Sequence, residues 1–348
     1  MLNKYFFISL ILIAGCIKES SATYPVEDFQ TSATLLGELE SRGDFINSLD
    51  FPAIVDADYV YQYYSEFYII ELRNLEDYNS GHLENSVRLN NTQLFEHTAN
   101  IETSRKILLV SNTGQSSAYY TALLRFYGLK NVFSLNFGIS SWNQDFSHYY
   151  LPYLHNVIDT TVWNLGGIYT NKPYPKNRFS ELPLIEAESE SIQGLLNERI
   201  NNLLNEDFAV NAVTRDFIDF RNTEENYTIC YGTPSLYYVF KTGDPRFPGH
   251  PIVAVFYNSS YISGDLKSTT NLQTIPPDKN VYIYSYSGQR SAILAAYLQL
   301  LGFNAKSILF GGHNMFARRF VINNDSTDAP DLVQYGYLNN IKNYPYVK

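Results

Sequence analysis

The chain has 348 residues, of which 45% are hydrophobic, and this is enough for two globular domains with cores of their own. A net charge of −10 argues against nucleic acid as a partner, because phosphate binding needs clustered Lys and Arg. The six histidines are scattered and the two cysteines are far apart, so no metal-ligand spacing is present and we expect neither a metal nor a cofactor.

The first sixteen residues have the features of an export signal. An apolar stretch of about eleven residues follows Lys4, and it is too short to span a bilayer as a helix. The end of the stretch, Ile13-Ala14-Gly15-Cys16, resembles a bacterial lipobox, which implies cleavage before Cys16 and a lipid on that residue. We therefore expect residues 1–16 to be a lipoprotein signal and the lipid to hold the protein at the membrane of a bacterial cell envelope, facing the periplasm or the surface. The alternative is a plain signal peptide with an incidental cysteine.

An internal repeat organises the rest of the chain. The segments Ile107–Gly138 and Val281–Gly312 align without a gap at an offset of 174 residues, with about ten of 32 positions identical. Each contains a β-rich run, a loop with a central Gly, a stretch with helical apolar spacing and a second β-rich run, the last of these at 307–310 in the second copy. Gly128 and Gly302 follow the predicted helices, where a left-handed residue is favoured. Repeated βαβ units predict α/β domains, each an open parallel sheet with helices on both faces.

The repeat also sets the expected domain bounds. Residues 17–50 are predicted to be a tether with a helical extension at 31–41. The remaining parts are domain one at 51–150, a linker with a helix at 151–206, domain two at 207–325, and a Tyr-rich tail at 326–348. An offset this long indicates a duplicated domain and not a solenoid. We expect the tail to pack back on a domain surface.

The order of short motifs resembles the rhodanese-like (sulfurtransferase) family. The first domain carries Glu71-Leu72-Arg73, Tyr78, Gly81-His82, the loop from Ser111, and Asn136-Phe137-Gly138 with Trp142. The second carries Gly249-His250, the loop from Ser285, and Gly311-Gly312-His313. These motifs occur twice in the same order and cover about two thirds of the chain. The resemblance implies two rhodanese-like domains, in which the Gly-His pairs, Arg73 and Trp142 are expected to have structural roles.

In that family the first loop residue is a cysteine that accepts sulfur as a persulfide, held by backbone N–H groups and a helix N-terminus. Here the two positions are Ser111 and Ser285. A serine hydroxyl stays protonated near neutral pH and its oxygen cannot carry a persulfide, so we expect no catalytic residue and regard both serines as vestigial. Cys230 aligns with Glu71 in a predicted strand, where a buried filler is expected. His313 is the nearest candidate base for Ser285, but a structural role is favoured.

The second loop is predicted to bind a small anion such as sulfate or phosphate, because Arg290 can pair with an oxyanion near a helix N-terminus. The residues of this predicted site are Ser285, Tyr286, Ser287, Gly288, Gln289, Arg290 and Ser291. The first loop consists of Ser111, Asn112, Thr113, Gly114, Gln115 and Ser116. Ser116 stands where the second loop has Arg290, so the first site should be weaker. The alternative is a pair of loops closed by their own hydrogen bonds.

Three functions stay open on the sequence alone. The leading interpretation is a non-catalytic binding or scaffolding protein that descends from a sulfurtransferase and has an envelope protein as a possible partner. The second is an envelope sulfurtransferase for thiosulfate or persulfide sulfur with a noncanonical active site. The third is a pure interaction surface, with the linker helix and the tail as the contact.

Overall fold

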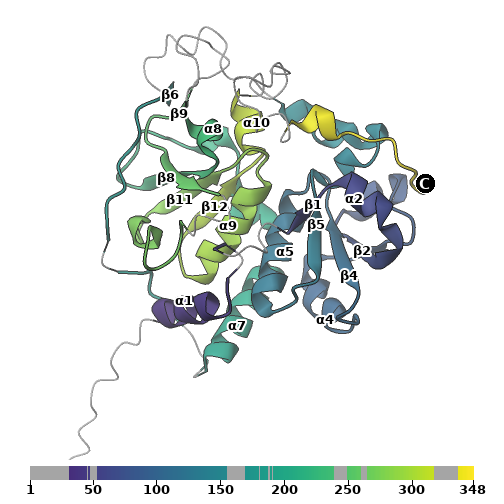
Figure 1. The fold of residues 1–348 in the computed structure, drawn as a ribbon, viewed down its shortest axis with the longest axis horizontal. Coiled ribbons are helices and arrows are strands. Elements are labelled where there is room, and N and C mark those ends of the chain that lie inside the picture. Colours follow the sequence, from purple (N-terminus) through teal and green to yellow (C-terminus); the bar gives the residue numbers. More distant parts are fainter. Residues whose placement is uncertain are drawn as a thin grey trace, which may run out of the picture.

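The computed structural model describes residues 31–44, 46–47, 53–154, 169–179, 181–186, 189, 191–238, 249–259, 265–316 and 336–348. The expected signal and Cys16 lie outside these residues. Within the described ranges, no helix is both long and apolar enough to cross a membrane. Figure 1 shows two sheets side by side, each with helices around it.

The helices are α1 (Thr31–Ser41), α2 (Ala57–Gln62), α3 (Leu75–Ser80), α4 (Leu94–Ala99), α5 (Gln115–Tyr127), α7 (Ile192–Asn205), α8 (Pro234–Tyr237), α9 (Gln289–Leu300) and α10 (Gly311–Phe316). Short 3-10 turns are η1 (Tyr64–Glu66), η2 (Asn91–Gln93), η3 (Gly138–Ser141), η4 (Gln144–Tyr149), η5 (Leu151–Tyr153), η6 (Phe208–Asn211), η7 (Arg215–Phe217), η8 (Leu272–Thr274) and η9 (Tyr337–Asn340).

Two five-stranded parallel sheets form the centre of the molecule, as the α/β prediction requires. In the first sheet the strand order is β1 (Ile54–Val55), β5 (Val132–Leu135), β4 (Lys106–Val110), β2 (Phe67–Glu71) and β3 (Val87–Arg88). In the second it is β7 (Ala212–Val213), β12 (Ala305–Ile308), β11 (Asn280–Tyr284), β8 (Asn226–Gly232) and β10 (Val255–Asn258). The two orders correspond strand for strand. Two more short strands, β6 (Tyr169–Thr170) and β9 (His250–Pro251), pair antiparallel.

The gapless alignment of the repeat is wrong beyond the helices. Gly128 and Gly302 both follow their helices with positive φ, which keeps the offset of 174 residues. The following strands, β5 and β12, are offset by 173 residues instead of 174, and β12 (Ala305–Ile308) begins two residues before the expected 307–310. Gly138 and Gly311 then occupy equivalent places at φ +61° and +45°. In both, an added Cβ would lie about 2 Å from the carbonyl oxygen of the loop serine, so only glycine fits this close approach.

Each sheet buries both faces, which explains why its strands are nearly continuous runs of apolar residues. In β4, Ile107 and Leu109 pack toward α5, whereas Leu108 and Val110 belong to a separate cluster on the opposite face with Trp142. The second sheet divides in the same way between its α9 face and a cluster that includes Cys230. Trp142 is therefore a core residue, as expected.

The two sheets share one apolar core, because α5 packs against α9 and a single buried cluster includes residues of both helices. The linker helix α7 contacts α5, α9 and α1, and its buried face includes Leu196 and Ile200. Helix α1 precedes the first sheet in sequence but binds the second half, since the Glu40 carboxylate accepts hydrogen bonds from Ser268 N and Oγ, each at 2.7 Å. These elements hold the two halves together.

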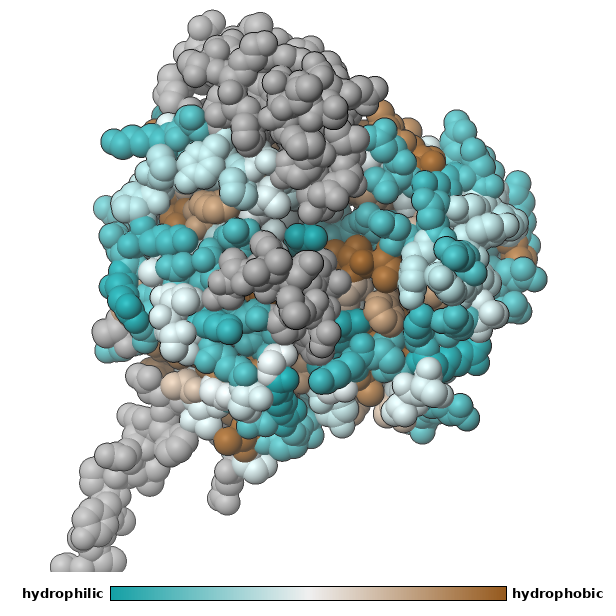
Figure 2. Space-filling view, viewed as in Figure 1, coloured by the Kyte–Doolittle hydropathy of each residue, from teal (hydrophilic) through white to brown (hydrophobic). Residues whose placement is uncertain are grey.

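The described part of the tail packs back on the first half, as predicted. Val347 pairs antiparallel with His82, and the Trp142 indole donates to the Pro345 carbonyl at 2.8 Å. Tyr344 stacks on Tyr61 at 3.9 Å between ring centroids. The face drawn in Figure 2 is mainly hydrophilic where it is coloured, and it is interrupted by small groups of hydrophobic residues.

Candidate functional site

The first loop runs from the end of β4 into α5 and is closed around the hydroxyl of Ser111. That side chain is 4% exposed. Its Oγ accepts hydrogen bonds from the backbone N–H of Gly114 at 3.0 Å and of Ser117 at 3.4 Å, and contacts Ser117 Oγ at 3.1 Å. Ser117 Oγ in turn contacts Ser134 Oγ at 2.9 Å. Two N–H groups that could face an anion are thus directed at the serine itself. Gln115 and Ser116, expected in the loop, lie in the first turn of α5.

The second loop repeats this arrangement between β11 and α9. Ser285 is 1% exposed, and its Oγ accepts from Ser291 N at 3.1 Å and donates to Ser291 Oγ at 3.3 Å. Ser291 Oγ donates to the Gly288 carbonyl and contacts Ser307 Oγ at 2.9 Å. The chain of serine hydroxyls Ser285–Ser291–Ser307 therefore matches Ser111–Ser117–Ser134 in the first half. In this loop too the helix begins earlier than expected, at Gln289.

Two glutamines connect the loops across the boundary between the halves. Gln115 Oε1 accepts from Phe310 N at 2.8 Å, and Gln289 Oε1 accepts from Phe137 N, also at 2.8 Å. Gln289 Nε2 additionally donates to the Gly114 carbonyl at 3.2 Å and the Leu135 carbonyl at 3.3 Å. Both glutamines are 1% exposed. Each loop thus supplies the side chain that satisfies buried backbone groups of the other half.

A buried aromatic group closes the same boundary. Tyr150 is fully buried, and burial holds its pKa well above the ordinary value, so the hydroxyl stays protonated. Its oxygen lies 2.8 Å from His313 Nδ1 and 3.4 Å from the Ser287 carbonyl. The His313 ring also lies parallel to Phe137, with 5.9 Å between ring centroids. These contacts belong to a packed interface, as the structural interpretation of His313 expects.

Two other members of the predicted anion site, Tyr286 and Arg290, point away from Ser285. Tyr286 is buried in the core on the far face of the sheet, where its hydroxyl contacts Thr233 Oγ1. Arg290 is half-buried, and its guanidinium donates to Ser259 Oγ at 3.2 Å, just beyond the end of β10. Cys230 is fully buried within β8, as expected of a filler residue.

The polar motifs of the first half form a buried network around the first loop. The Glu71–Arg73 ion pair has N···O at 3.0 Å with both side chains fully buried. Arg73 also donates to the Gly81 carbonyl at 2.6 Å and to Asn112 Oδ1 at 2.8 Å. Burial is the largest influence on Glu71 and raises the pKa of its carboxyl group. This network fixes the first loop against the chain around Gly81.

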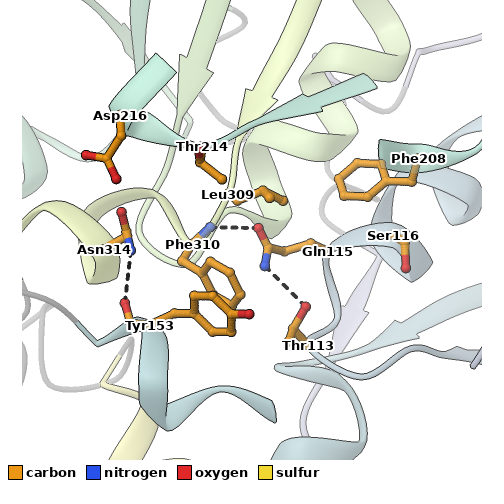
Figure 3. A pocket seen from close by; sticks show the side chains of 10 residues that line it. All are labelled: Thr113, Gln115, Ser116, Tyr153, Phe208, Thr214, Asp216, Leu309, Phe310 and Asn314. Carbon is orange, nitrogen blue, oxygen red and sulfur yellow. Dashed lines mark hydrogen bonds between the residues drawn. The ribbon is translucent and has the colours of Figure 1, made fainter. Parts of the chain in front are cut away.

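A cavity of about 450 Å³ opens beside the first loop, between the two halves. Figure 3 shows its lining, which consists of Thr113, Gln115, Ser116, Tyr153, Phe208, Thr214, Asp216, Leu309, Phe310 and Asn314. The loop that was expected to be the weaker site therefore borders this cavity, and Ser111 and Ser285 do not. No group of three or more His, Cys, Asp or Glu able to share a metal ion occurs among the residues that the structure describes.

Sequence reasoning identified the loops but missed what surrounds them. The sequence could have pointed to the bridging roles of Gln115 and Gln289, because the same residue occurs at the same position of both repeats. Tyr153, Asp216 and Asn314 had none, because they come from η5, η7 and α10, which lie far apart in the chain.

Comparisons with known proteins find a family match within the first half. Residues 56–145 match the model of the rhodanese-like domain. The thiosulfate sulfurtransferase GlpE of Shewanella oneidensis is 29% identical over 76 residues, which are 22% of this chain and 75% of that protein. A solved rhodanese-related protein from Thermoplasma volcanium is 24% identical over 25% of this chain and 87% of its own, with a TM-score of 0.24. A solved probable thiosulfate sulfurtransferase is 16% identical over 71% of this chain and 93% of its own, with a TM-score of 0.28.

The family match runs from α2 to η4 and includes the loop that begins at Ser111. It agrees with the motif order, the parallel sheet and the buried Glu71–Arg73 pair. Residues 56–145 of this chain therefore form a rhodanese-like domain.

Proposed function

We propose that this chain is a rhodanese-like protein without sulfurtransferase activity, which acts as a binding or scaffolding protein at a bacterial cell envelope. In this proposal both halves are rhodanese-like, and Cys16 carries the lipid. One observation supports the loss of activity most directly. At both positions where a reactive sulfur would be needed, a buried serine oxygen is engaged in the hydrogen bonds of its own loop.

The chemical reason is the nature of the nucleophile. Sulfur transfer needs a polarisable thiolate that is accessible to its donor. Ser111 and Ser285 have neither an ionisable sulfur nor an open surface. Cys230 is the one cysteine within the described residues, and full burial in the middle of β8 keeps thiosulfate away from its thiol.

The competing proposal is an envelope sulfurtransferase, and the likeness to a protein named thiosulfate sulfurtransferase favours it. An assay of sulfur transfer from thiosulfate to cyanide separates the two. We expect no turnover above the no-enzyme background from the purified chain, and none from Ser111→Cys or Ser285→Cys, because a sulfur placed there is still buried. Turnover by the unmodified chain that Ser285→Ala or Cys230→Ala abolishes would defeat the non-catalytic proposal.

Anion binding at the second loop is a smaller part of the proposal. A site there would lie at Arg290, beside Ser259, and not at the closed Ser285 hydroxyl, since Arg290 supplies a half-buried guanidinium in the first turn of α9. Millimolar sulfate, phosphate or thiosulfate should raise the melting temperature of the purified chain, and Arg290→Gln should abolish the rise. An Arg178→Gln variant is the control, because Arg178 is an exposed arginine whose guanidinium bonds to Gln273. Equal shifts in all three proteins, or no shift in any, would contradict a site at this loop.

Attachment to the membrane has its own test. Expressed with its complete N-terminus in a bacterium, the chain should incorporate labelled palmitate and sediment with membranes. Cys16→Ala should lose both properties. Incorporation that survives this substitution would show that Cys16 is not the lipidated residue.

A further inference from the structure

The cavity beside the first loop has no role in the sulfur chemistry of either proposal, because neither loop serine lines it. Its volume of about 450 Å³ lies within the range of about 300–1,000 Å³ that is usual for small-molecule sites. Its walls come from both halves of the chain, with Ser116 on α5 and Asn314 on α10. The shared core of the two halves holds these walls in place, so the cavity is a built feature and not a surface irregularity.

One wall of the cavity is aromatic. The ring of Tyr153 stacks on that of Phe310, with 4.1 Å between centroids and planes 8° apart (Figure 3). Phe310 is nearly buried, whereas Tyr153 is 44% exposed and Phe208 adds a further apolar surface. The backbone of Tyr153 is held as well, since its carbonyl accepts a hydrogen bond from Asn314 Nδ2 at 3.3 Å. The result is a supported aromatic platform that faces solvent.

Apart from Leu309, the rest of the lining is polar. Thr113, Ser116 and Thr214 bring hydroxyl groups, and Asn314 brings an amide. Asp216 is the one formally charged residue among those that line the cavity, and its carboxylate is paired with the adjacent guanidinium of Arg215. No lysine or arginine belongs to the described lining, so these residues offer no cationic side chain to sulfate or thiosulfate.

We propose that this cavity binds a small, uncharged, hydroxyl-rich ligand with one apolar face, which is the chemistry of a mono- or disaccharide. The hydroxyl, amide and paired carboxylate groups offer donors and acceptors for sugar hydroxyls, and Tyr153 offers a flat surface for the C–H face of a pyranose ring. The inference rests on the proposed function as a binding protein, and it names the class of ligand that the protein takes.

Calorimetric titration of the purified chain with methyl α-glucoside, N-acetylglucosamine and maltose tests the proposal. We expect at least one of these sugars to bind with a dissociation constant below about 10 mM. Tyr153→Ala should weaken that binding at least tenfold, and Asn314→Ala should weaken it by a smaller factor. Tyr63→Ala is the matched control, because Tyr63 is a tyrosine of similar exposure, 36%, that caps the end of α2 outside the cavity lining, and it should leave binding unchanged.

Choline and sodium thiosulfate serve as charged probes in the same titration. Failure of all three sugars to bind, binding that Tyr153→Ala leaves intact, or binding of choline or thiosulfate in their place would overturn the proposal. None of these results bears on the sulfur-transfer assay, so failure of the sugar site and failure of the non-catalytic assignment are distinguishable. Circular dichroism of each variant confirms that the fold is retained.

Discussion

Gln115 and Gln289 each hydrogen-bond to the opposite half of the molecule, and these bonds allow a quantitative prediction about stability. Replacing Gln289 by Ala removes three hydrogen bonds in a buried site, to Phe137 N, the Gly114 carbonyl and the Leu135 carbonyl. A buried hydrogen bond contributes about 1 kcal/mol net, and an N–H left without an acceptor costs about 1–3 kcal/mol. Because the Phe137 N–H has a single acceptor in Gln289, we expect Gln289→Ala to lower the free energy of unfolding by about 2–4 kcal/mol.

Replacing Gln115, the equivalent residue of the first half, should destabilise the protein less than replacing Gln289, and this difference makes the test more specific. Gln115 accepts from Phe310 N at 2.8 Å, but its amide nitrogen donates only within its own loop, to Thr113 Oγ1 at 3.2 Å. Gln115→Ala is therefore expected to cost about 1–2 kcal/mol. The two substitutions act on different backbone N–H groups, so their effects should be roughly additive unless the halves separate in the double variant.

Urea unfolding at neutral pH, followed by circular dichroism and by tyrosine fluorescence, measures both changes as shifts of the transition midpoint. Gln144→Ala is the control, because Gln144 is exposed at the start of η4 and should change stability by less than about 0.5 kcal/mol. If Gln289→Ala proves no more destabilising than Gln144→Ala, the glutamines do not hold the two halves together and the reasoning is refuted.

Three further predictions concern the supports around the site. Burial lowers the pKa of His250 below its ordinary value of about 6.5, so the unfolded chain binds the proton first and the stability should fall as the pH drops below about 6.5. His250→Gln should flatten this part of the stability–pH curve, and an unchanged slope would exclude His250 as its source. Arg73→Met leaves the buried Glu71 carboxylate without its cation and should lower the free energy of unfolding in urea by about 3–5 kcal/mol. The double variant with Glu71→Gln should recover part of this stability, and no recovery would contradict the ion-pair explanation. Tyr337→Ala removes a buried ring stacked on that of Tyr150 and a hydrogen bond to the Ser140 carbonyl, so it should lower the free energy of thermal unfolding by about 3 kcal/mol or more. The control Leu338→Ala, at an exposed residue, should lower it by less than about 0.5 kcal/mol. Similar losses in the two variants would argue against a structural role for the tail.

Much of the fold could be predicted because its signals are local. The apolar runs that became β4 and β11 have the composition of strands buried on both faces, and the glycines at 128 and 302 mark the helix ends. The error in the repeat came from a single missing residue between Gly302 and Ser307. Local patterns fix the kind of element, but they fix its register poorly where both faces of a strand are apolar.

The sequence by itself determined the two α/β repeats, the order of the rhodanese-like motifs and the oxygen atoms at Ser111 and Ser285, because each of these depends on residues close together in the chain. Only the tertiary structure decided that the loops are closed, that Gln115 and Gln289 cross between the halves, and that Arg290 points to Ser259. It also decided where the cavity opens, because Ser116, Tyr153 and Asn314 meet only when α5, η5 and α10 pack together. Such contacts form between residues up to about two hundred positions apart, and a one-dimensional pattern carries no information on which distant side chains come to share a surface.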